Sequence, residues 1–295
     1  MKKPASALSL TLILSQLAFA DPPKTSAWSL TFSDEFDGTA LDAAKWTSGY
    51  VIEKTGPGSW ADPGNVRFAN GHLQLFGEKR AGEGKSFAGA AINTRGKFSQ
   101  LYGYFEVRYK AAKGKGFSSK LTAIRPDAGL PPLMDMVEFR GEETNRPYWY
   151  MHYDDGAGEQ VAGGGSAGAD LATDFHLFGT EWNADNIIWY IDGVEKMRAK
   201  VGPGLKHAIF FGLELMVGGS DWIGIPDAST PWPGMVEVDW IHVYQRTGPA
   251  SIPKADRSHA GTGSARSVGK PTGYLASGRK PAGNPRRIAS ILMGP

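Results

Sequence analysis

The sequence of 295 residues contains no cysteine, so disulfide bonds cannot stabilise its fold. Stability must therefore come from a sizeable hydrophobic core, with or without a bound metal. Three catalytic signatures are also missing: a His/Cys cluster with zinc-ligand spacing, a phosphate-cradling Gly-rich loop and a G-x-S-x-G nucleophile elbow. Beyond the first 20 residues, no segment approaches the ~20 apolar residues of a membrane span. We expect a soluble chain without an organic cofactor.

The N-terminus has the layout of a secretory signal. Lys2 and Lys3 precede an apolar run of about a dozen residues, and the small-residue pattern A-F-A ends just before Asp21. A buried strand or helix is the alternative, but it does not explain why the three regions occur in this order. We therefore expect residues 1–20 to be a cleaved signal and the chain to be secreted or periplasmic in a bacterium.

The composition favours strands joined by tight turns, with 39 Gly, 14 Phe, 10 Tyr and 9 Trp and only 21% charged residues. Short runs of alternating apolar and polar residues fill residues 28–246, as in YGYFEVRYK at 102–110. NIIWYIDGVEKMR at 186–198 predicts a hairpin that turns at Asp192-Gly193. No stretch shows a sustained helical period. Residues 21–246 are thus predicted to form one two-sheet β-sandwich domain.

Residues 247–295 differ from the rest of the chain. They are rich in Gly, Ser, Pro and Ala and hold three Lys and five Arg against one Asp, a formal net charge of +7. The whole chain has a formal net charge of +2, of which residues 1–20 contribute +2 and residues 247–295 contribute +7. The remaining residues 21–246 therefore carry −7. The simplest interpretation of this segment is a solvated, disordered tail. The alternative is a tether to anionic envelope polymers or phosphate head groups. Nucleic acid is not an expected partner of an exported chain.

Five segments in order resemble glycoside hydrolase family 16, the laminarinase and lichenase group. The matching segments are FSDEFDG (32–38), NVRFANGHLQL (65–75), INTRGKFSQLYGYFEVRYKAAKGKG (92–116), HLFGTEWNADNIIWYIDG (176–193) and LELMVGGSDWIGIPDASTPWPGMVEVDWIHVYQ (213–245). The resemblance implies an all-β jelly-roll β-sandwich of the concanavalin A-like lectin and glucanase type. It also implies an open concave cleft for a β-glucan or related exopolysaccharide, in a protein that we expect to be a monomer.

The stretch LPPLMDMVEFRG at 130–141 aligns with the catalytic signature E-x-D-x-x-E of this family. By resemblance, Glu138 is the acid/base and Asp135 the middle carboxylate, which keeps the proton states of its neighbours apart. The first Glu, the nucleophile, falls on Leu133. A β-bulge is needed to bring Glu138 onto the face of the other two positions. Retaining glycosidases need two carboxylates ~5–5.5 Å apart, and Leu133 supplies no lone pair or charge for attack on the anomeric carbon.

The aromatic residues of the family pattern are missing around this motif as well. The family commonly reads G-x-W-P-A-F-W upstream, and here the aligned stretch is GFSSKLT at 116–122. Ser118 and Thr122 therefore replace two tryptophans, and Leu130 replaces the tryptophan before the two prolines. These replacements remove ring faces on which a pyranose would stack.

Four further residues are candidates for the same cleft. Glu214 stands where many relatives have Asn, and it is either a relocated carboxylate that pairs with Glu138 for inverting chemistry or a ligand of a substrate hydroxyl or a cation. Trp222 is expected to stack on a sugar. His152 is either a cleft histidine or a satisfied core or surface residue. Arg140 contacts glycan, or pairs with the acidic residues Glu142 and Glu143 on the surface.

The resemblance also implies a structural calcium on the convex side, away from the cleft. Its contributors would be Glu35, Asp239 and backbone carbonyls such as that of Gly71, which are the hard oxygen ligands that calcium requires. These ligands are dispersed in the sequence and form no local motif.

Two functions from different classes compete. In the first, the chain is a polysaccharide-binding protein in which normal retaining hydrolysis is lost or strongly reduced. In the second, it is an active endo-β-1,3(4)-glucanase-type hydrolase that uses Glu138 with the displaced carboxylate of Glu214. A structural envelope protein attached through the basic tail is a third possibility. Loss of a nucleophile removes many orders of magnitude in rate while binding can survive.

Overall fold

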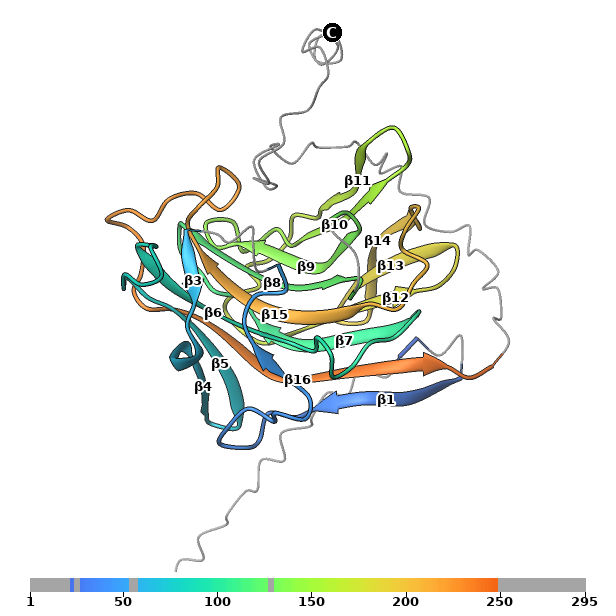
Figure 1. Cartoon of the computed structure of the whole chain (residues 1–295), viewed down its shortest axis with the longest axis horizontal. Helices are drawn as coiled ribbons and strands as arrows, with labels where there is room; N and C mark the ends of the chain where they lie inside the picture. Colours follow the sequence, from blue (N-terminus) through green and yellow to red (C-terminus); the bar gives the residue numbers. More distant parts are fainter. Residues whose placement is uncertain (1–21, 24–26, 53–57, 127–129, 249–295) are drawn as a thin grey trace, which may run out of the picture.

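The computed structural model describes residues 22–23, 27–52, 58–126 and 130–248. The predicted signal at 1–20 and almost the whole of the basic tail lie outside these residues, so both stay predictions. Two eight-stranded sheets make up the described part of the chain (Figure 1). Its one helical element is a short 3-10 helix, η1 (Pro63–Asn65). No helix among the described residues is long and apolar enough to cross a membrane.

The first sheet, here the motif sheet, contains the catalytic signature. Its order is β11-β10-β9-β8-β15-β6-β2, and β3 pairs with β6. The strand bounds are β2 (Thr47–Ser48), β3 (Ser59–Ala61), β6 (Phe87–Asn93), β8 (Phe117–Ile124), β9 (Leu133–Arg140), β10 (Tyr148–Asp154), β11 (Glu159–Gly165) and β15 (Phe210–Val217). Figure 1 shows β15, β8, β9 and β10 side by side in the middle of this sheet.

The second sheet, here the back sheet, packs behind the motif sheet. Its order is β14-β13-β12-β7-β16-β5-β4, and β1 pairs with β16. The strand bounds are β1 (Trp28–Asp34), β4 (Val66–Ala69), β5 (His72–Gly77), β7 (Gly103–Lys110), β12 (His176–Trp182), β13 (Asn186–Ile191), β14 (Val194–Lys200) and β16 (Gly234–Arg246). The antiparallel, all-β sandwich confirms the predicted fold class.

The main core lies between the sheets, as the alternation of side chains requires. Phe105, Val107 and Tyr109 of β7 point into this core with at most 1% of their surface exposed. From the motif sheet, the opposing layer is formed by residues such as Phe139 and Phe211. Because successive side chains of a strand point to opposite faces, the other face of the motif sheet is left to the signature residues.

The hairpin predicted at 186–198 forms as β13 and β14. Asp192 has φ +49° and Gly193 has φ +75°, so both central residues of the turn lie in the left-handed region. Two consecutive residues with positive φ match the twist of the flanking strands. Asp192 tolerates this conformation, and its carboxylate accepts a hydrogen bond from the backbone N–H of Leu177 at 2.9 Å.

Candidate active site

Strand β9 contains the β-bulge that the signature spacing requires. Against β8, Val137 and Asp135 pair with consecutive residues, so Met136 is the extra residue. Against β10, three steps from Asp135 to Glu138 match only two steps on the partner strand. The extra residue brings Asp135 and Glu138 to the same face of the sheet despite their odd spacing. The predicted bulge is therefore confirmed.

Glu138, Lys120 and Glu214 form a row across three neighbouring strands. Lys120 of β8 pairs directly with Glu138 of β9 and with Glu214 of β15. Directly opposed residues of antiparallel strands project from the same face, so the three side chains lie on one side of the sheet. Since neighbouring strands are ~4.8 Å apart, the backbones of the two glutamates are roughly 10 Å apart, with the lysine between them.

Lys120 is buried among carboxylates. Its Nζ lies 3.7 Å from Oε2 of Glu214 and 3.9 Å from Oδ1 of Asp135. Lys120 is 1% exposed and Asp135 0%, so this ion cluster lies outside solvent contact. Attraction between such charges is strong because little water screens them, although each charge also loses its own hydration.

Glu214 is held by two donors on the same face. Its Oε1 accepts a hydrogen bond from the backbone N–H of Val51 at 2.5 Å, while its Oε2 faces Lys120. Burial is the largest influence on this carboxyl and raises the pKa of Glu214 above its ordinary value. The negative charge of Asp135 adds to this increase, whereas Lys120 and the Val51 N–H oppose it.

Glu138 lies against an aromatic cluster. The Nε1–H of Trp222 donates to Oε1 of Glu138 at 3.0 Å, and the Ser118 hydroxyl donates to the same oxygen at 3.4 Å. The Trp222 ring makes edge-to-face contacts with Tyr148 and Tyr150 at centroid distances of 4.8 and 5.8 Å. Trp222 itself is buried and binds the acid/base candidate directly. Its predicted stacking on a sugar stays a prediction.

Leu133 packs into an aliphatic and aromatic cluster further along β9, away from the row. Its buried partners are Val51, Ile124 and Phe210, and Leu130 packs against the same group. In the strand register Leu133 lies opposite Ile124 of β8. The position that the resemblance assigns to the nucleophile is therefore an apolar site filled by hydrocarbon.

His152 lies beside Leu133 on β10 and shares its face through direct pairing. Its Nδ1 is 2.9 Å from Oε1 of Glu159, and its buried Nε2 has no hydrogen-bond partner among the described residues. The structure therefore places His152 next to the candidate site, where its role as a ligand of glycan stays a prediction.

Arg140 fixes the segment that carries Trp222. Its Nε donates to the Trp222 carbonyl at 2.9 Å, and its guanidinium lies over the indole ring at 5.3 Å. It also forms ion pairs with Glu142 and Glu143. The surface pairing expected as one alternative is thus present, and Arg140 supports the Trp222–Glu138 contact from behind.

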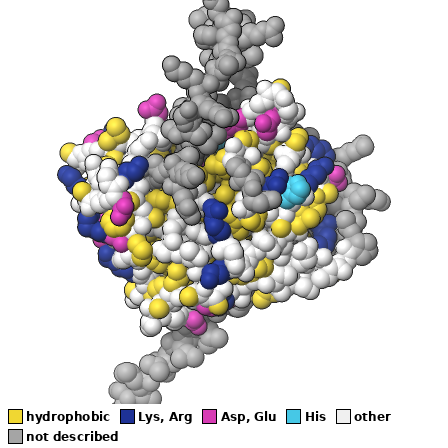
Figure 2. All heavy atoms as spheres, in the orientation of Figure 1, with side chains coloured by type: hydrophobic (Ala, Val, Ile, Leu, Met, Phe, Trp, Pro, Cys, Tyr) yellow, Lys and Arg dark blue, Asp and Glu magenta, His cyan; other side chains and the backbone are white. Residues whose placement is uncertain are grey.

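The face around the site carries basic and hydrophobic side chains (Figure 2). Arg95 donates to the Val51 carbonyl at 2.7 Å and lies 4.5 Å above the Phe210 ring, next to the Leu133 cluster. The signature residues themselves are nearly inaccessible: Leu133 and Glu214 are 4% and 3% exposed. A cavity of about 310 Å³ lies elsewhere, between the segment 39–48 and β4, and its lining includes Leu41, Arg67 and Phe68.

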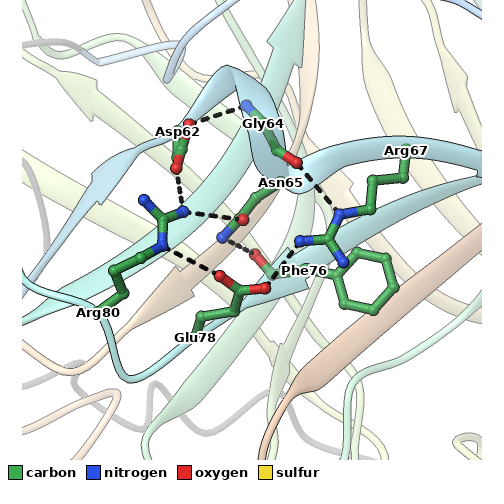
Figure 3. A network of polar contacts seen from close by, with 7 residues as sticks. All are labelled: Asp62, Gly64, Asn65, Arg67, Phe76, Glu78 and Arg80. Atoms are coloured by element: carbon green, nitrogen blue, oxygen red, sulfur yellow. Dashed lines mark hydrogen bonds and ion pairs between the residues drawn. The ribbon is translucent and has the colours of Figure 1, made fainter.

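A polar network beside this cavity belongs to the frame of the sandwich (Figure 3). Arg80 binds the carboxylates of Asp62 and Glu78, and its Nη2 donates to Asn65 at 3.1 Å. Arg67 donates to Glu78 at 2.8 Å. The network ties η1 and β4 to the end of β5. Both carboxylates of the network, Asp62 and Glu78, form ion pairs with its two arginines, so the charges within the network are balanced.

The residues expected to hold calcium have other contacts. Asp239 forms ion pairs with Arg108 and, at 3.4 Å, with His72. Glu35 Oε1 lies 2.7 Å from Nε2 of His242. Gly71 forms the turn between β4 and β5 with φ +76°. No group of three metal-binding side chains occurs among the described residues. The calcium site therefore stays a prediction based on resemblance.

The sequence profile described as Glycosyl hydrolases family 16 matches residues 59–242, which include the three strands of the site, β8, β9 and β15. The chain belongs to this family. A beta-glucanase of Acetivibrio thermocellus is 30% identical over 220 residues, covering 74% of this chain and 63% of the relative. The endo-1,3-1,4-beta-glycanase ExsH of Rhizobium meliloti is 26% identical over 252 residues, covering 74% of this chain and 52% of the relative. The chain thus spans about half to two thirds of these family 16 relatives.

Solved structures of the family have the same architecture. The laminarinase catalytic domain of Thermotoga maritima is 27% identical with a TM-score of 0.67, covering 75% of this chain and 99% of that domain. The corresponding domain of Thermotoga petrophila is 28% identical with a TM-score of 0.68, covering 76% and 100%. About three quarters of the chain therefore matches the whole of each of these laminarinase catalytic domains.

Lys120 and Tyr150 are site residues that the sequence prediction missed. Lys120 carried a visible signal, because it is the one charged residue in the strand FSSKLTAI and has the same parity as Ser118 and Thr122. The aromatic wall is harder to find, because Tyr148 and Tyr150 occur in the aromatic run YWYMHY, where either face could be the core.

Proposed function

We propose that this protein is exported and interacts with β-glucan or a related exopolysaccharide, with normal retaining hydrolysis lost or strongly reduced. The observation that carries this proposal is the packing of Leu133 against Val51, Ile124 and Phe210 at the nucleophile position. The printed activities of family relatives, beta-glucanase and endo-1,3-1,4-beta-glycanase, support β-glucan as the substrate class.

The chemistry of retention explains why this one position matters. The nucleophile must attack the anomeric carbon while a second carboxyl, ~5–5.5 Å away, protonates the leaving oxygen. Glu138 keeps the second role by position, but the aliphatic side chain of Leu133 cannot form a glycosyl-enzyme. Binding contacts that do not take part in bond breaking can survive this loss.

A second candidate function is inverting hydrolysis by Glu138 with Glu214. It is favoured by one observation: both glutamates project from the same face, paired to Lys120 from opposite sides. Inversion needs carboxyl groups ~6.5–9.5 Å apart with a water between them. Here the buried lysine occupies the space between, and Glu214 already holds the Val51 N–H. We therefore favour binding without normal hydrolysis.

The test compares binding with cleavage in the same preparation. We expect the purified protein to be retained by laminarin, lichenan or an acidic exopolysaccharide in affinity electrophoresis and to release no reducing ends. Glu138→Gln should leave both results unchanged. Glu195→Gln is the matched control, because Glu195 pairs with Arg198 on β14 of the back sheet. Release of reducing ends by the parent that disappears in Glu138→Gln would refute the proposal and favour the hydrolase.

A further inference from the structure

Lys120 and Glu214 are two departures from the family pattern that contact each other. By the resemblance described above, Lys120 stands at the Ala position of G-x-W-P-A-F-W, and Glu214 stands where many relatives have Asn. One change adds a positive charge and the other a negative charge. Their charged atoms lie 3.7 Å apart, and the residues are directly paired across β8 and β15. The two changes therefore compensate each other in charge and in space.

The surroundings leave Lys120 as the central cation of the row. Asp135 and Glu138 reach this face from β9, and Glu214 reaches it from β15. The residue that faces Asp135 from β10 is Tyr150, and the residue that faces Glu214 from β6 is Ala91. Neither is a cation, and both are buried. A buried carboxylate is costly unless it is paired, and Lys120 supplies a cation within 4 Å of both Asp135 and Glu214.

We infer that Lys120 is a positioning residue whose ammonium group holds Asp135, a signature carboxylate, and Glu214 in one buried charge network. The network is a second obstacle to hydrolysis, independent of Leu133, because Asp135 faces an ammonium group where the family mechanism has it support a neighbouring carboxylate. This last consequence rests on the proposed function, whereas the network itself does not.

The test is a double-mutant cycle of Lys120→Met and Glu214→Gln, measured by urea unfolding at pH 7.0 and pH 4.5. We expect Lys120→Met to lower the folding equilibrium constant by about a hundredfold or more, because it leaves buried carboxylates without their cation. Lys120→Met/Glu214→Gln should recover at least about tenfold of this loss, and the loss should shrink at pH 4.5, where carboxylates take up protons.

Lys110→Met is the matched control. Lys110 pairs with Glu237 on the back sheet at 3.2 Å but is one-third exposed, so its replacement should change the constant by no more than about fivefold at either pH. The inference is overturned if Lys120→Met has the same effect in the parent and in Glu214→Gln and at both pH values, since only packing would then be lost. If Lys120→Met alone does not fold, a folded double variant supports the network, and a double variant no better than the single one overturns it.

The activity arm separates this inference from the proposed function. Leu133→Glu with Lys120 intact is expected to release no reducing ends from laminarin. Hydrolysis by this variant would overturn Lys120 as a second obstacle. Hydrolysis by the parent would instead overturn the proposed function, while the result of the stability cycle would still stand.

Discussion

Replacing Leu133 with glutamate returns the carboxyl group that the signature lacks, but it places that group in a hydrocarbon environment. Leu133 is 4% exposed and touches the buried side chains of Val51, Ile124 and Phe210. The substitution loses apolar burial worth about 2 kcal/mol. Burial also raises the pKa of the new carboxyl, and each pKa unit costs about 1.4 kcal/mol at a pH where the group would otherwise be ionised. We expect a total loss of about 3 kcal/mol or more at pH 7.5.

The pH dependence separates the two contributions. A group whose pKa is raised in the folded state loses stability as the pH rises from its unfolded pKa to its folded pKa. The loss caused by Leu133→Glu should therefore grow between pH 4 and pH 7.5. Leu133→Gln has nearly the same shape without a titrating group, and its loss should stay constant. Free energies of unfolding from urea titrations of the parent and both variants provide the measurement.

One result would refute this reasoning. If Leu133→Glu is as stable as the parent at pH 7.5, position 133 is open to water and ready for a carboxylate. The packing of Leu133 would then be no barrier to a restored nucleophile.

Three other substitutions have defined outcomes. Burial raises the pKa of Glu214, so the contribution of this residue to stability is complete below its ordinary pKa and decreases as the pH rises through its folded pKa. Glu214→Gln should therefore flatten the decline in unfolding free energy from acid to neutral pH. An unchanged pH profile would contradict this. Trp222→Phe removes the indole donor to the buried Glu138 and should cost about 1–3 kcal/mol in urea unfolding, whereas no loss would mean that the hydrogen bond has no weight. Burial and the hydrogen bond to Glu143 raise the pKa of Tyr148 to about 12, so Tyr148→Phe should remove a tyrosinate absorbance step near that pH in alkaline titration, and an intact step would contradict the assignment.

Strand period and turn chemistry were sufficient to predict the frame of the fold. The alternation in β7 placed Phe105 and Val107 in the core, and Asp192-Gly193 located a hairpin turn. The odd spacing within the signature required a bulge, which the structure has at Met136. The alternation and the turn depend on neighbouring residues in the sequence, and the bulge follows from strand period once the resemblance assigns the signature positions.

The state of the site could not be predicted in the same way, because it depends on pairing between strands far apart in the chain. Whether Glu214 faces Glu138 is decided by the register of β15 against β8, more than 90 residues away in sequence. The same register places Lys120 between them.

The resemblance implies two kinds of change on this face of the sheet, the apolar residue Leu133 and the charged pair Lys120 and Glu214. Only the first would follow directly from loss of a nucleophile. Leu133 fits its site because Ile124 and Phe210 surround it with hydrocarbon. Loss of a nucleophile alone, however, gives no reason to bury a new lysine, since an isolated buried ammonium is strongly unfavourable. Two carboxylates stabilise the buried ammonium group of Lys120. Asp135 lies 3.9 Å from it, and Glu214 lies 3.7 Å from it. An acid that already binds an ammonium and a backbone N–H has little freedom to activate water. The contact that makes Lys120 tolerable is therefore an argument against Glu214 as a replacement nucleophile or base, in line with the function proposed above.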